Sequence, residues 1–307
     1  MTKANKAIFL IVCVSLVAFT LFYGTVHQPT ISLFYLTVMS MVLLWGVDCF
    51  VSGELKISRH PIQIPLYATF LYALVQLLPF GTIGEVAGLS GIPRTLTLSP
   101  FDTEMTAYHV LALGLFSSVA LVVIDSTARL KRLVALITIF GSIFAFYAIL
   151  QSFLSPGKIY GIYERIGANP FGSYVNRHNY AAFIEMCIAV PLGMLLSGAI
   201  TRDKKLIYIT AIALMSVSLL LSGSRGGLVA IVAALVFLLL ITNKASGYKK
   251  VAMRLGLAVV LIGVIVAGSF YIGGDSSLTR IADTATSKDV TTDRTHIWGI
   301  TMKIIVA

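Results

Sequence analysis

Residues 205–242 read KLIYITAIALMSVSLLLSGSRGGLVAIVAALVFLLLIT, and this stretch shows how the chain is organised. Two apolar runs, 205–221 and 226–242, are joined by the segment SGSRGG, whose last two glycines begin the second run. A membrane helix needs about 20 predominantly apolar residues, and both runs are close to that length. Serine and glycine between them favour a tight turn. The stretch therefore predicts a helical hairpin that crosses a membrane twice, with Arg225 at the turn.

The rest of the chain repeats this pattern of long apolar runs. Of its 307 residues, 57 % are hydrophobic and 12 % are charged, whereas soluble domains carry about 25 % charged residues. Strands are not expected, because the runs do not alternate and lipid cannot satisfy an open sheet edge. The prediction is an all-α, polytopic integral membrane helical bundle with about nine transmembrane helices, near 7–23, 30–50, 62–80, 107–125, 133–154, 178–198, 205–221, 226–242 and 251–272. Residues 1–272 would form the transmembrane domain, and 273–307 the start of a large periplasmic loop.

Lysine and arginine gather in alternate connections between these runs. Basic residues of short loops stay on the cytoplasmic side, so the pattern predicts a cytoplasmic N-terminus and an external SGSRGG turn. The same placement explains the net charge of +10 without a nucleic-acid partner. The residues concerned are Lys56, Arg59, Arg129, Lys131, Arg132, Arg202, Lys204, Lys205, Lys244, Lys249, Lys250 and Arg254.

Arg225 lies on the external side, where anchoring by basic loops does not explain it. Ser222 or Ser224 can cap the following helix, and Gly226 and Gly227 leave its first N–H groups uncovered. A helix N-terminus and a guanidinium group together favour an anion such as phosphate. The alternative is a plain helical hairpin whose arginine extends to the membrane surface.

A second external cluster precedes the sixth run. Asn176, Arg177 and His178 stand at its start, and Glu185 lies seven residues after His178, about 10 Å deeper on nearly the same helix face. Ala181 leaves room for a close neighbouring helix. An ionisable residue at that depth favours a functional role. The alternatives for Glu185 are neutralising an arginine, or a protonated carboxyl hydrogen-bonded between helices.

A third cluster lies after residue 273 and contains Arg280, Arg294 and His296. Arg294 starts the segment RTHIWGITMKII, which is predicted to be an amphipathic helix along the membrane surface. The chain stops within this pattern at Ala307, so a longer protein is expected. No nucleotide-binding motif and no metal-ligand spacing occurs in the sequence, and neither a cofactor nor a metal is predicted.

Three segments, PFGSYVNRHNYAAFIEM, LLLSGSRGGLVA and DRTHIWG, together resemble the O-antigen ligase and Wzy-type polymerase superfamily over roughly residues 160–307. The resemblance implies a glycosyltransferase of the bacterial inner membrane. It would transfer a glycan from undecaprenyl diphosphate to a saccharide or lipid A core acceptor at the periplasmic face, among membrane lipids and without a cofactor.

The resemblance also implies roles for individual residues. Arg225 matches an arginine that holds the diphosphate, and Arg294 is assigned with it as catalytic. The expected base is a histidine further into the large loop. The order Asn-Arg-His-Asn at 176–179 departs from the family's Asn-Arg-Asn-His, which turns the imidazole by about 100° on a helix. The predicted substrate-binding residues are Asn176, Arg177, His178, Glu185, Ser222, Ser224, Gly226 and Arg280.

Two other functions remain open from the residues. A transporter or flippase of lipid-linked saccharides would also need external arginines, although transporters bury polar elements near the midplane. A scaffold protein could use the same arginines only to pair with lipid phosphates. The gathering of charge at one face favours the enzyme.

Overall fold

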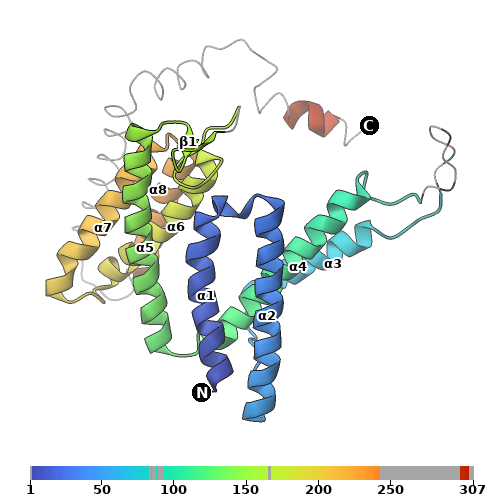
Figure 1. Cartoon of the computed structure of the whole chain (residues 1–307), viewed down its shortest axis with the longest axis horizontal. Coiled ribbons are helices and arrows are strands. Elements are labelled where there is room, and N and C mark those ends of the chain that lie inside the picture. The colour runs from blue at the N-terminus through green and yellow to red at the C-terminus, as the bar shows by residue number, and fades with distance from the viewer. Residues whose placement is uncertain are drawn as a thin grey trace. The chain divides into compact units, whose positions relative to one another are not determined.

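The structure, a computed structural model, describes residues 2–82, 84, 88, 91, 93–164, 167–242 and 298–303, without the side chains of Arg225, Leu240 and Thr242. It is largely helical (Figure 1). The helices are α1 (Lys3–Leu21), α2 (Gln28–Ser52), α3 (Ile64–Gln76), α4 (Pro100–Val123), α5 (Thr127–Leu154), α6 (Arg177–Ser197), α7 (Arg202–Leu221) and α8 (Arg225–Thr242), with 3-10 turns η1 (Tyr23–Thr25) and η2 (Pro61–Gln63). Two compact units make up the chain, residues 1–137 and 138–307, and α5 belongs to both.

Within the described residues, six helices are long and apolar enough to cross a membrane: α1, α2, α4, α5, α6 and α7. They confirm a multi-pass helical membrane protein, but not the predicted nine spans. The prediction for 62–80 is wrong in length, since α3 has 13 residues, about 20 Å against a hydrocarbon core of about 30 Å. Pro65 sits in its first turn, and Pro79 prevents its continuation.

The last two predicted spans have a different outcome. The structure describes α8 over 18 residues, and its segment Gly226–Leu239 is apolar. The ninth predicted span, 251–272, lies outside the described residues.

In the first unit, α1, α2 and α4 share an apolar core. Ile8 and Val12 of α1 pack with Met41 of α2 and with Val119 and Val123 of α4. Lipid is as apolar as these side chains, so close packing rather than burial from water holds the three helices together.

A polar network closes one end of this unit. Asp48, 2 % exposed, accepts a hydrogen bond of 3.0 Å from Asn5 Nδ2. Arg129, 4 % exposed, donates to the carbonyl oxygens of Val123 and Asn5 and pairs with Asp125 at 3.6 Å. Arg129 was predicted only as a basic residue of a cytoplasmic connection. Its burial with partners makes it a structural residue as well.

In the second unit, α6 and α8 run parallel. A Cβ added to Gly227 would lie 2.8 Å from Ala181 Cβ, and a Cβ added to Gly193 would lie 3.5 Å from Leu238 Cδ2. The first contact joins the early part of α6 to the early part of α8, and the second joins their later parts. The two helices therefore begin at the same end of the unit, and α7 runs back between them. The predicted alternation of these three helices is therefore confirmed.

The connection between α5 and α6 holds a small antiparallel hairpin. β1 (Lys158–Ile159) pairs with β2 (Tyr163–Glu164), and Lys158 Nζ lies 3.5 Å from Glu164 Oε2. Gln151 Nε2 of α5 donates to Lys158 O at 2.7 Å. The expectation of no strands is wrong here, because this connection is not one of the apolar runs to which the argument about lipid applies.

The residues after the hairpin are held against α5 and α6 by an aromatic cluster. The Tyr180 ring is fully buried, with its centroid 4.7 Å from that of Phe171 and 5.5 Å from that of Phe144. Gly172 has a left-handed φ of 60°, and a Cβ there would lie 2.9 Å from the Tyr180 ring. This packing fixes the chain that leads into α6.

Candidate functional site

The start of α6 is set by Asn176 and by a preceding loop residue. Asn176 Oδ1 accepts a hydrogen bond of 2.9 Å from His178 N, which makes it the helix cap. Arg177 N donates to Asn169 O at 2.9 Å. The predicted Asn-Arg-His cluster therefore stands at a capped helix N-terminus.

The start of α8 is capped by Ser224. Its Oγ accepts from Gly227 N at 3.3 Å, and the residue is 2 % exposed. Ser222, equally buried, instead donates to Leu219 O at 2.6 Å and ends α7. Of the two serines predicted as caps, Ser224 has that role. The prediction that both glycines leave N–H groups uncovered is wrong for Gly227, whose N–H binds Ser224.

Two contacts bring the starts of α6 and α8 together. His178 Nδ1 lies 3.0 Å from Ser224 Oγ, and either atom can be the donor. Arg177 Nη1 lies 3.5 Å from the point that a Cβ on Gly223 would occupy. Arg177 is thus next to the turn that carries Arg225, the first residue of α8.

Gly223 was not predicted to belong to this site. Its φ is 63°, a left-handed value that favours glycine. The signal was present in the sequence, since a glycine directly after a helix commonly takes this conformation. A larger residue there would be strained by this φ, and its Cβ would be in van der Waals contact with Arg177.

Gly226 and Glu185 have different surroundings. No heavy atom lies within 4 Å of a Cβ added to Gly226, so the first turn of α8 is open on that side. Glu185 Oε2 is buried and makes no hydrogen bond to another residue in the described part of the chain. Glu185 lies within α6, two turns after His178, as predicted.

The third predicted cluster falls mostly outside the described residues. Arg280, Arg294 and His296 are not among them. Residues 298–303 are helical, in agreement with part of the predicted amphipathic helix, and Trp298 is 65 % exposed. No group of three His, Cys, Asp or Glu side chains in the described ranges could hold a metal ion.

Comparison with known proteins gives a match to a family model. The family model described as O-antigen ligase matches residues 210–307. This third of the chain is therefore similar to the O-antigen ligase family. No curated protein and no solved structure matches the chain.

The O-antigen ligase segment confirms the superfamily predicted from the three motifs. It contains Ser222, Ser224 and Arg225, and it also covers the positions of Arg280 and Arg294. Asn176, Arg177 and His178 precede this segment, although their helix packs against it. The family indicates a membrane glycosyltransferase-type function with lipid-linked glycan and polysaccharide substrates.

The cap of α8 gives a direct stability prediction. Replacing Ser224 with alanine removes the acceptor of Gly227 N–H and the partner of His178. We expect the free energy of unfolding to fall by about 0.5–2 kcal/mol. Ser224→Thr keeps a hydroxyl group at this position and should keep most of the stabilisation by the cap. Thermal unfolding in detergent measures the change. Ser197→Ala, at an exposed serine near the end of α6, is the matched control and should have little effect.

Proposed function

We propose that the protein transfers a glycan from undecaprenyl diphosphate to a saccharide or lipid acceptor at the periplasmic face of the inner membrane. The observation that carries the proposal is the meeting of the α6 and α8 starts inside a membrane protein with an O-antigen ligase segment. This contact unites two of the three predicted clusters.

The arrangement suits a diphosphate. Each helix N-terminus carries a partial positive charge from its aligned backbone dipoles, and here two helix starts lie close together. Arg177 and Arg225 add two guanidinium groups, which bind phosphate oxygens in a bidentate way. Ser222, Ser224 and Gly226 shape the turn between them, and Arg280 and Arg294 are proposed to complete the site from the loop.

The proposed reaction breaks the bond between the anomeric carbon of the glycan and the diphosphate oxygen. An acceptor hydroxyl forms the new bond to that carbon and gives its proton to a base, for which the family resemblance implies a histidine of the large loop. Negative charge grows on the departing diphosphate, so fixed guanidinium groups stabilise the transition state more than the bound donor.

The test uses the full-length protein in proteoliposomes with a labelled polyprenyl-diphosphate glycan and a separate acceptor. We expect labelled acceptor to form, together with released polyprenyl diphosphate. Movement of the intact donor across the bilayer without any transfer product would contradict the proposal and favour a flippase. Absence of both donor binding and transfer would favour a scaffold.

Arg177 supplies a prediction about donor binding. Replacing it with glutamine removes a charge-assisted contact worth about 1.5–3 kcal/mol, so KM for the donor should rise by about 10-fold to 100-fold. Lys158→Gln is the matched control, because this half-exposed lysine of the connection before α6 forms its ion pair with the exposed Glu164 among its described neighbours. An unchanged KM in Arg177→Gln would remove Arg177 from the donor site.

A further inference from the structure

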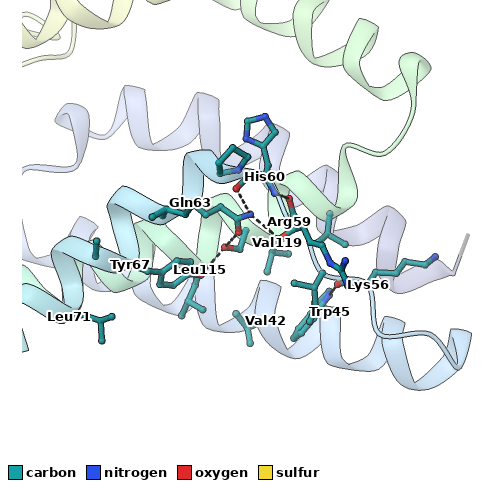
Figure 2. Close-up of a pocket in the computed structure, with 17 residues that line it drawn as sticks. Val42, Trp45, Lys56, Arg59, His60, Gln63, Tyr67, Leu71, Leu115 and Val119 are labelled. Atoms are coloured by element: carbon teal, nitrogen blue, oxygen red, sulfur yellow. Dashed lines mark hydrogen bonds between the residues drawn. The ribbon is translucent and has the colours of Figure 1, made fainter.

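The first unit contains a cavity that the proposed function does not use. It has a volume of about 650 Å³ and lies between α2, α3 with η2, and α4 (Figure 2). Cavities of about 300–1,000 Å³ are typical of small-molecule sites. Its apolar lining includes Val42, Ala68, Leu71, Leu115 and Val119.

The polar side chains in the wall are bonded to one another. Ser118 Oγ lies 2.5 Å from Gln63 Oε1 and 2.7 Å from Tyr67 OH. Gln63 Nε2 donates to Ser58 O at 3.0 Å. Because these groups satisfy each other, the wall presents mainly carbon to an occupant, and an acyl chain suits it better than a sugar or a peptide backbone.

Positive charge gathers at one end of the cavity. Lys56 and Arg59 line it there together with Trp45, whereas Leu71 lies at the other end (Figure 2). Trp45 Nε1 donates to Lys56 O at 3.0 Å and holds this connection against α2. Lys56 pairs with Glu54 at 3.7 Å, and the exposed Arg59 makes no ion pair within the described residues. Arg59 therefore supplies a positive charge at this end that no carboxylate of the described residues pairs with.

We propose that this cavity binds an anionic phospholipid, with one acyl chain along the apolar wall and the phosphate at Arg59 and Lys56. The connection that carries both residues is predicted to be cytoplasmic, and anionic lipids of that leaflet attract basic residues near the surface. The acyl chains of different lipids fit the apolar wall equally well. The preference for an anionic lipid therefore comes from its headgroup at Arg59 and Lys56. The proposal is independent of glycan transfer, whose proposed site is made of residues of the other unit.

The test uses the full-length protein in phosphatidylcholine nanodiscs that contain a trace of phosphatidylglycerol with a photoactivatable acyl chain. We expect cross-links to map by mass spectrometry to peptides of α3 and α4 that line the cavity. The double substitution Lys56→Gln and Arg59→Gln should lower this labelling by about 10-fold or more. Lys131→Gln with Arg132→Gln is the matched control, since it removes two exposed basic residues of another predicted cytoplasmic connection and should leave labelling unchanged.

A second variant tests the cavity rather than the charge. Ala68 lines it and is exposed, so Ala68→Trp should fill the space and abolish the mapped cross-links. If this variant fails to fold, competition with unlabelled phosphatidylglycerol on the wild-type protein gives the same information and should remove the label. Equal labelling by a phosphatidylcholine probe would overturn the proposal. The proposal would also be overturned if only polyprenyl diphosphate, or inorganic phosphate, displaced the phosphatidylglycerol probe.

Discussion

Replacing Arg225 with lysine is expected to lower the rate of glycan transfer by about 100-fold to 1,000-fold at normal protein levels, which is the usual loss when one fixed donor to a developing negative charge is removed. Lysine keeps the charge but loses the planar fork that binds two phosphate oxygens together. Arg225 is the first residue of α8, beside the Arg177 contact, so its replacement changes the centre of the proposed site. Transfer of a labelled glycan in proteoliposomes, followed on a gel, measures the effect.

Arg202 provides the control for this experiment. It is the first residue of α7 and is exposed, but it lies on the predicted cytoplasmic side. Arg202→Lys should therefore transfer glycan at the wild-type rate. Normal rates and product lengths in Arg225→Lys, with the protein correctly inserted, would show that Arg225 is only a hairpin residue.

Adding a single methyl group at Gly227 is expected to lower the stability of the second unit by about 1–3 kcal/mol, the usual effect of overpacking. In Gly227→Ala the new Cβ would lie 2.8 Å from Ala181 Cβ and 3.0 Å from Leu219 Cδ1. Either α8 moves away from α6 or the side chains are compressed, and both outcomes disturb the contact between His178 and Ser224. Thermal unfolding in detergent measures the loss, and transfer activity should fall with it.

The neighbouring glycine is a matched control. Gly226→Ala adds the same methyl group where no heavy atom lies within 4 Å, so stability should stay constant or rise by up to about 1 kcal/mol from helix propensity. The double substitution Ala181→Gly with Gly227→Ala moves the methyl group to the other helix and should recover most of the loss. A Gly227→Ala protein as stable as the wild type would contradict the close packing of α6 and α8.

Hydrophobic runs predicted most of the long helices and, for α6, also its ends. The sixth run was predicted at 178–198 and forms α6, Arg177–Ser197. Apolar length measures the free energy of transfer into lipid, and most of these runs are helical throughout. For α3 the prolines decide the ends instead, and they shorten the helix below a full crossing.

The sequence predicted the two motifs of the candidate site, but it did not predict that they lie next to each other in the fold. The Asn-Arg-His and SGSRGG segments were each identified from local chemistry. His178 and Ser224 are 46 positions apart, and their contact depends on the register in which α6 packs on α8. Small residues such as Ala181 and Gly227 set that register, and pairs of small residues occur too often in membrane helices to identify partners. The sequence likewise did not predict that Arg129 is buried, because its burial depends on Asn5, which is far from it in the sequence.

Because α6 and α8 pack through Gly227 and Ala181, donor binding and thermal stability should respond differently to salt. This packing is a contact between carbon atoms, whereas the proposed donor site acts through charge and helix ends. Raising ionic strength from about 0.15 M to 1 M shortens the Debye length from about 8 Å to about 3 Å and leaves dispersion forces unchanged. High salt should therefore weaken capture of the donor while the melting temperature stays constant, so ionic strength can vary binding with the scaffold held fixed.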